Sequence, residues 1–338
     1  MMSVTVHFVT NRNHIPENAK ALFGGRFNPD GVASLRFGKA EFDVTGQTPL
    51  MNSITVFDET LAVQPAAGFV TSGSNMLLTS LHEAMAVGKR DTVVFIHGFN
   101  VTFMEALKAG ARLGAELANN PNIIVFSWPS DGTMVPFMSY YSDREDARAS
   151  GPALARTYLK LLDFVAGLDD ETRCRQALHI VAHSMGAYVL RQGLQAICAK
   201  DSRRLVRLFD QIILAAPDED DDAFETDEKL KKLPMLGRRV TVYFNRNDRA
   251  LLVSDSTKTN PDRLGSDGPR MLDLLPKKVI VVDCYRIAAR SDPVVQHSYY
   301  INNSSVSADL RATLADTESR LIENREMVRP EFAFRLSN

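Results

Sequence analysis

The chain has 338 residues, 45% of them hydrophobic and 24% charged, which is enough apolar material to bury one large core. A formal net charge of −2 with scattered lysines and arginines argues against a nucleic-acid partner. No run approaches the roughly 18 apolar residues of a membrane span, and three cysteines without regular spacing do not form a disulfide framework. We therefore expect a cytoplasmic protein that acts on a small neutral substrate; its oligomeric state is left open.

The N-terminal part, residues 1–89, differs in pattern from the rest of the chain. Strand-like pieces at 4–10 and 53–57 are separated by stretches that contain glycine and proline. We predict that residues 1–89 form an extension of added strands and flanking loops packed on the core. Residues 90–338 then form the catalytic domain.

From residue 90 onward, short apolar runs alternate with amphipathic stretches. The runs expected to form buried parallel strands are 93–96, 123–128, 178–182, 212–216, 240–244 and 279–282. The stretches expected to form helices are 103–117, 144–165 and 188–197. This alternation predicts an α/β fold with a mostly parallel, doubly wound sheet and helices on both faces.

The sequence His-Gly-Phe-Asn at residues 97–100 directly follows the first of these strands. Gly98 allows a tight turn, so that the Phe99 N–H can face an oxygen on which negative charge develops. We interpret His97 as a structural residue that holds this loop by hydrogen bonding.

Methionine and aromatic residues are dense at 133–141, shortly after Trp128. Such a stretch can line an acyl pocket or fill gaps in the core near the start of a helix, and packing is the favoured interpretation.

Residues 182–186, Ala-His-Ser-Met-Gly, lie between the apolar run 178–182 and the helical stretch 188–197. They differ from the G-x-S-x-G pattern of a nucleophile elbow only at the first position, where Ala182 adds one methyl group. Such a turn exposes the hydroxyl of Ser184 above the sheet and directs the Met185 N–H toward a developing oxyanion. The motif predicts acyl transfer through a serine ester.

A nucleophilic serine needs a base, and the base needs a carboxylate. His297 is the only histidine downstream of Ser184, so it is the expected base. Two acids follow strand-like runs: Asp218 after 212–216 and Asp248 after 240–244. Position at a strand end does not separate them, but the commonest arrangement in this fold favours Asp248, with Asp218 as the alternative. Residues 218–222, an acidic run, are most simply interpreted as a solvated loop.

No cofactor or metal site is predicted. His179 and His183 have the spacing of a helical zinc motif, but a strand that leads into an elbow does not place both rings on one face. A polar stretch at 254–275 is expected to form a long loop near the active site.

These motifs together resemble one bacterial family. The residues that carry the similarity are 8–12, 97–100, 126–132, 182–186, 215–218 and 247–251. The family is the group of α/β hydrolases long catalogued as a domain of unknown function, and the resemblance extends to about His297. It implies a serine hydrolase with Ser184 as nucleophile, Asp248 as acid, His297 as base, and Phe99 with Met185 as the oxyanion hole. Members are mostly known as predicted esterases, so the resemblance implies no particular substrate.

The sequence therefore predicts a carboxylic ester hydrolase without a cofactor. An acyltransferase or thioesterase would use the same three residues and differ only in the acyl acceptor or donor. A catalytically silent protein that binds a ligand in the same pocket is the alternative from another class.

Overall fold

The computed structural model describes most of the chain, namely residues 2–46, 48–57, 72–117, 119–130, 136–169, 171, 173–251, 262–288 and 294–337. Its described strands form an eleven-stranded sheet in the order β12-β13-β11-β10-β9-β8-β6-β7-β1-β4-β5 and a separate hairpin of β2 and β3. The strand bounds are β1 Met2–Thr10, β2 Arg12–His14, β3 Phe23–Phe27, β4 Arg36–Thr45, β5 Thr48–Phe57, β6 Thr92–Ile96, β7 Asn122–Ser127, β8 Leu178–His183, β9 Phe209–Ala215, β10 Gly237–Phe244, β11 Val279–Asp283, β12 Arg325–Arg329 and β13 Ala333–Leu336.

The centre of the sheet is parallel, from β1 through β7, β6, β8, β9, β10 and β11 to β13. Antiparallel strands lie at both edges, where β4 and β5 extend the sheet beyond β1 and β12 pairs with β13. All six strands expected between residues 93 and 282 are present. The N-terminal strands β1, β4 and β5 belong to the same sheet as the rest of the chain.

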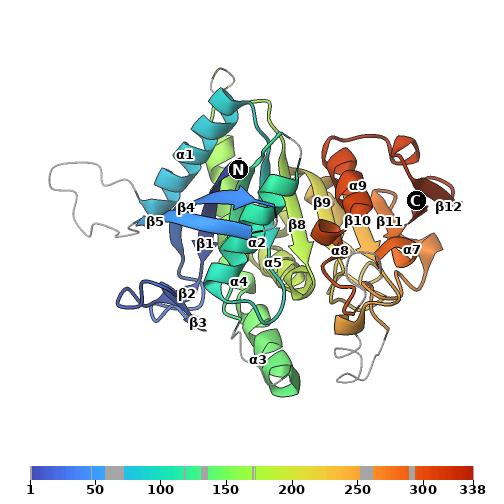
Figure 1. The fold of residues 1–338 in the computed structure, drawn as a ribbon, viewed down its shortest axis with the longest axis horizontal. Helices are drawn as coiled ribbons and strands as arrows, with labels where there is room; N and C mark the ends of the chain where they lie inside the picture. Colours follow the sequence, from blue (N-terminus) through green and yellow to red (C-terminus); the bar gives the residue numbers. More distant parts are fainter. Residues whose placement is uncertain are drawn as a thin grey trace.

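Helices cover both faces of the sheet (Figure 1). Their bounds are α1 Gly73–Gly88, α2 Phe103–Glu116, α3 Pro136–Ala149, α4 Gly151–Ala166, α5 Met185–Asp201, α7 Tyr285–Ala288, α8 Tyr299–Asn302 and α9 Ser304–Leu314. Alternate side chains of each strand point to opposite faces. Val94 and Ile96 of β6 therefore pack in the core with α1, α4 and α5, whereas Val93 and Phe95 pack in the core with α2, α8 and α9.

Two helix predictions need correction. One helix was expected over 144–165, but the structure has α3 and α4, because the chain is interrupted at Ser150 and Pro152 lies at the start of α4, where its missing N–H costs nothing. The 1–89 region, expected to contain only strands and loops, also contains α1. Ser72 caps this helix by accepting a hydrogen bond from the Asn75 N–H.

Candidate active site

Ser184 occupies the turn between β8 and α5. Its backbone has φ 53° and ψ −126°, a conformation that is strained for any residue with a side chain. The turn fits only because Gly186 follows, since a Cβ there would lie 2.3 Å from the backbone oxygen of Ile96. Ala182, where the motif usually has glycine, is completely buried within β8. The sequence Ala-His-Ser-Met-Gly thus forms a sharp strand-to-helix turn with the serine at its apex.

The loop after β6 packs directly against this turn. A Cβ on Gly98 would lie 2.9 Å from the Cβ of Ser184, so only glycine allows the loop to come this close. His97 stacks on Trp128 with 5.2 Å between ring centroids, and the Trp128 indole donates to the His97 carbonyl at 3.0 Å. Burial and the nearby Arg12 guanidinium lower the pKa of His97 to about 3. His97 is therefore neutral, and it supports the loop by this packing and by a hydrogen bond from its Nδ1 to the Gly98 carbonyl at 2.9 Å.

Two backbone N–H groups are the expected oxyanion donors: that of Phe99, directly after Gly98, and that of Met185, directly after Ser184 at the first position of α5. Neither donates a hydrogen bond to a loop, turn or cap partner in the described part of the chain. Unsatisfied donors at the start of a helix attract negative charge.

His297 and Asp248 form a close pair. The Nδ1 atom of His297 lies 2.7 Å from Oδ2 of Asp248, and Asp248 is completely buried. Its other carboxylate oxygen accepts hydrogen bonds from the backbone N–H groups of Ala250 at 3.1 Å and Leu251 at 3.3 Å. Burial raises the pKa of Asp248, while the interaction with His297 acts in the opposite direction. The carboxylate is thus fixed on three sides and orients the imidazole.

The His297 ring also lies beside the elbow. Its centroid is 4.7 Å from that of His183, the residue directly before Ser184. The loop that carries it is anchored to the end of β10, because Arg249 N–H donates to Val295 at 3.0 Å and the Asn245 side chain donates to the Gln296 carbonyl at 3.1 Å. Ser184 and His297, more than a hundred residues apart in the sequence, thus lie on elements that meet at the carboxyl ends of the parallel strands.

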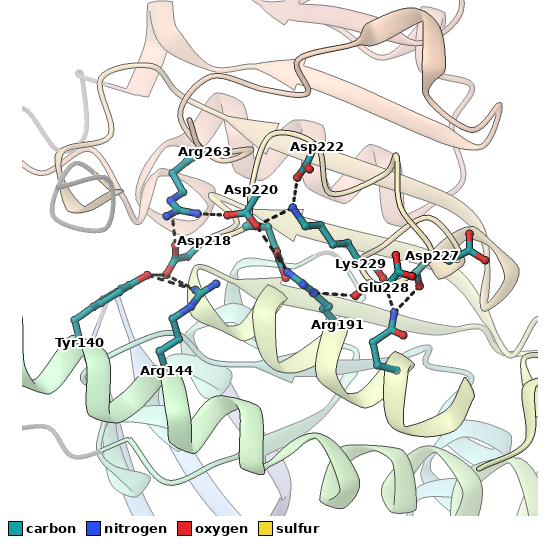
Figure 2. Close-up of polar contacts among 12 residues, drawn as sticks. Tyr140, Arg144, Arg191, Asp218, Asp220, Asp222, Asp227, Glu228, Lys229 and Arg263 are labelled. Carbon is teal, nitrogen blue, oxygen red and sulfur yellow. Dashed lines mark hydrogen bonds and ion pairs between the residues drawn. The ribbon is translucent and has the colours of Figure 1, made fainter. Parts of the chain in front are cut away.

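Asp218, the alternative acid, has different partners (Figure 2). The Tyr140 hydroxyl donates to its Oδ2 at 2.8 Å, and the guanidinium groups of Arg144 and Arg263 each lie 3.8 Å from the carboxylate. Its backbone N–H donates to the carbonyl of Ser184 at 3.1 Å. Asp218 therefore borders the elbow through its backbone, while its side chain belongs to a cluster of arginines.

The acidic run 218–222 is not a solvated loop, which corrects the prediction from sequence. Asp218 and Glu219 are buried, and Figure 2 shows cations reaching into the run from several elements. Arg191 of α5 pairs with Glu219 at 3.1 Å, and Lys229 pairs with Asp220 at 2.9 Å. The run is packed because these cations neutralise it, a condition that a local charge pattern does not reveal.

The polar stretch 254–275 is described from residue 262 onward, and residues 254–261 lie outside the described residues. Leu264 N–H donates to the Glu219 carbonyl at 2.8 Å, and the completely buried Arg263 pairs with Asp220. The described part of the predicted loop thus packs on the acidic run 218–222. In the aromatic stretch 133–141, residues 133–135 and the side chains of 136–138 are also outside the described part. The Tyr140 ring packs against Phe99 at 5.8 Å.

Arg12 lies within residues 8–12, which carry part of the family resemblance, but the sequence assigned it no role; the structure shows that it supports the loops at the site. This buried side chain donates to the carbonyl of Val101 at 2.7 Å, in the same loop as Gly98, and to that of Ser130 at 3.1 Å, in the loop after β7. Its position directly after the buried strand β1 is the one signal that could have identified it. No group of three or more metal-ligating side chains occurs among the described residues.

The comparisons with known proteins identify the family. The chain matches a family described as alpha/beta hydrolase of unknown function (DUF900) over residues 76–317, more than half of its length, and it belongs to that family. The α/β-hydrolase fold expected from the sequence is therefore confirmed. The family description leaves the reaction and the substrate open.

Two solved structures show weaker similarity. A lipase-esterase related protein from Clostridium acetobutylicum has 10% identity and a TM-score of 0.33, with 67% of this chain and 96% of that chain covered. The acylaminoacyl peptidase of Pyrococcus horikoshii has 9% identity and a TM-score of 0.35, with 83% of this chain and 48% of the peptidase covered. No curated protein matches the sequence. Within the described residues, every helix is too short or too polar to cross a bilayer.

Proposed function

We propose that this α/β hydrolase cleaves carboxylic esters through an acyl-enzyme on Ser184. The observation that carries the proposal is the His297–Asp248 pair beside a strained serine turn, because a hydrogen-bonded imidazole and carboxylate are what a serine needs to become a nucleophile. The substrate is a small ester, and with three free cysteines the proposed compartment is the cytoplasm.

In the proposed reaction, Ser184 Oγ attacks the ester carbonyl while Nε2 of His297 takes the hydroxyl proton. Asp248 stabilises the imidazolium that forms. The backbone N–H groups of Phe99 and Met185 bind the oxyanion, and losing one such donor typically costs about 100- to 1,000-fold in turnover. His297 then returns the proton to the leaving alcohol, and water hydrolyses the acyl-enzyme by the same steps.

We further propose that residues 1–89 form an extension that supports the catalytic domain, residues 90–338. The contacts of Arg12 favour this role, because one guanidinium from the extension holds both the loop that contains Gly98 and the loop after β7.

The first experiment combines p-nitrophenyl esters of graded chain length with mass spectrometry after treatment with a fluorophosphonate. We expect an initial burst, an adduct on Ser184, and loss of both in Ser184→Ala. Ser202→Ala is the matched control, since Ser202 is exposed at the opposite end of α5. A folded protein without adduct or turnover would exclude the proposed reaction and favour a ligand-binding protein.

A further inference from the structure

A cavity of about 510 Å³ lies at the amino ends of β8, β9 and β10, whereas Ser184 lies beyond the carboxyl end of β8. Leu178, the first residue of β8, lines it, whereas Ser184 follows the last residue of the same strand. At about 3.3 Å per residue, the two places are separated by roughly 20 Å. The cavity is therefore not part of the candidate active site.

The inner wall of this cavity is apolar. Leu78, Leu81 and Met85 of α1 face Leu161 of α4, and Phe209 of β9 adds an aromatic ring. All five side chains are at least 91% buried, so a ligand in the cavity would contact a preformed apolar wall. The volume lies within the range of about 300–1,000 Å³ that is typical of small-molecule sites.

The outer wall is cationic. Arg173, Arg175, Arg207 and Arg238 line the cavity, and all four are exposed residues. Among the described residues that line it, Asp210 is the only acidic one, and it pairs with Arg238 at 3.6 Å.

Two other arginines of the outer wall, Arg175 and Arg207, differ from Arg238. Within the described part of the chain, no carboxylate forms an ion pair with Arg175 or Arg207. In a chain with a net charge of −2, these guanidinium groups are a local excess of positive charge above an apolar floor.

We propose that this cavity binds a long-chain fatty acid, with the alkyl chain against α1 and α4 and the carboxylate at Arg175 and Arg207. Arginine suits this ligand because its planar donor pair matches a carboxylate, and its exposure at the mouth avoids burying the charge. The site is separate from Ser184, so binding there does not require the proposed reaction.

The test measures binding of hexadecanoate, below its micelle concentration, by isothermal titration calorimetry. We expect Arg175→Glu/Arg207→Glu to weaken binding by about 10- to 100-fold, because two charge-assisted contacts become repulsive. The control Arg26→Glu/Lys108→Glu has the same net charge change on exposed residues outside the cavity, and it should bind like the wild type. Equal weakening in both variants, or equal affinity for hexadecyltrimethylammonium, would overturn the proposal.

Cys174 provides a second readout, since it lines the cavity and is a free, partly exposed thiol. Hexadecanoate should slow its alkylation by a maleimide, while Cys198, also free and partly exposed but outside the lining, reacts at an unchanged rate. Absence of protection at Cys174 would contradict the proposal.

Two further results separate this site from Ser184. Binding should persist in Ser184→Ala and after fluorophosphonate treatment; binding lost in both would place the ligand at the active site and overturn the proposal. Failure of fluorophosphonate to label Ser184 would count against the ester hydrolase alone, because the Cys174 readout does not depend on it.

Discussion

Two buried carboxylates at the ends of neighbouring parallel strands have opposite surroundings. Asp218 follows β9 and Asp248 follows β10, so both lie beyond the carboxyl ends of the parallel strands, as Ser184 does after β8. Asp248 is hydrogen-bonded to one imidazole and two backbone N–H groups. Asp218 accepts a hydrogen bond from a tyrosine hydroxyl and forms ion pairs with two guanidinium groups. The position at the strand end is shared, and only the partner differs.

That difference bears directly on function. An arginine keeps its proton throughout the physiological range, so a carboxylate paired with it holds structure in place. An imidazole exchanges its proton near neutral pH, so a carboxylate paired with it assists proton transfer. On this basis Asp248 is the proposed catalytic acid, and Asp218 is a residue that joins α3 to the elbow.

The largest effect is expected for Asp248→Asn. The amide can hold His297 in the wrong tautomer, and a change of this kind costs about 10,000-fold in kcat. The kcat for hydrolysis of p-nitrophenyl esters measures this loss, and circular dichroism checks that the variant is folded. If Asp248→Asn retains activity while Asp218→Asn loses it, the proposed roles of the two acids are reversed.

Asp218→Asn should instead affect stability. It removes the carboxylate charge that lies 3.8 Å from the guanidinium groups of both Arg144 and Arg263, which we expect to lower the free energy of unfolding by about 1–3 kcal/mol. Urea denaturation followed by fluorescence measures the change. Asp227→Asn is the control, because Asp227 pairs with Lys232 at the exposed surface. If Asp218→Asn is as stable as Asp227→Asn, Asp218 does not have the proposed structural role.

The fold could be predicted to a large extent from the sequence, because buried parallel strands appear as short apolar runs whose ends are sharply defined. The outer strands of the sheet were harder to predict than the central ones. β4 alternates buried and half-buried residues, and β12 is almost entirely exposed, so neither produces an apolar run. The single helix expected over 144–165 failed because an amphipathic pattern continues through the break at Ser150.

The candidate site was predictable where chemistry is encoded locally. The turn at Ser184 is such a case, because the residues two positions before and after it, Ala182 and Gly186, must be small. The cluster around Asp218 was not predictable, because Arg263 and Arg144 come from distant segments and the acidic run alone resembles a surface loop. Neutralisation of a buried charge depends on tertiary contacts, and the charge pattern of one segment does not contain them.

A smaller effect is expected for Tyr140→Phe. This change removes the hydroxyl that donates to Asp218 and keeps the ring that packs on Phe99. We expect a loss of about 0.5–1.5 kcal/mol in the free energy of unfolding, with little change in kcat. Tyr140→Ala removes the ring as well and should lower kcat further, because Phe99 loses its packing partner. Equal kcat values for the two variants would show that the ring does not position the Phe99 loop.

The pH dependence of stability should show the smallest effect, because opposing interactions partly cancel at Asp248. Burial raises its pKa above the ordinary value, and the pair with His297 only partly offsets the shift. The folded chain then binds this proton more tightly than the unfolded chain does. Ionisation of Asp248 therefore lowers stability as the pH rises through its folded pKa. Asp248→Asn removes that cost, so its stability relative to the wild type should improve as the pH rises from the ordinary pKa of an aspartate, about 4, through the raised pKa of the folded chain. Urea denaturation at several pH values measures the trend, and a difference independent of pH would mean that the pair with His297 fully compensates the burial of the carboxylate.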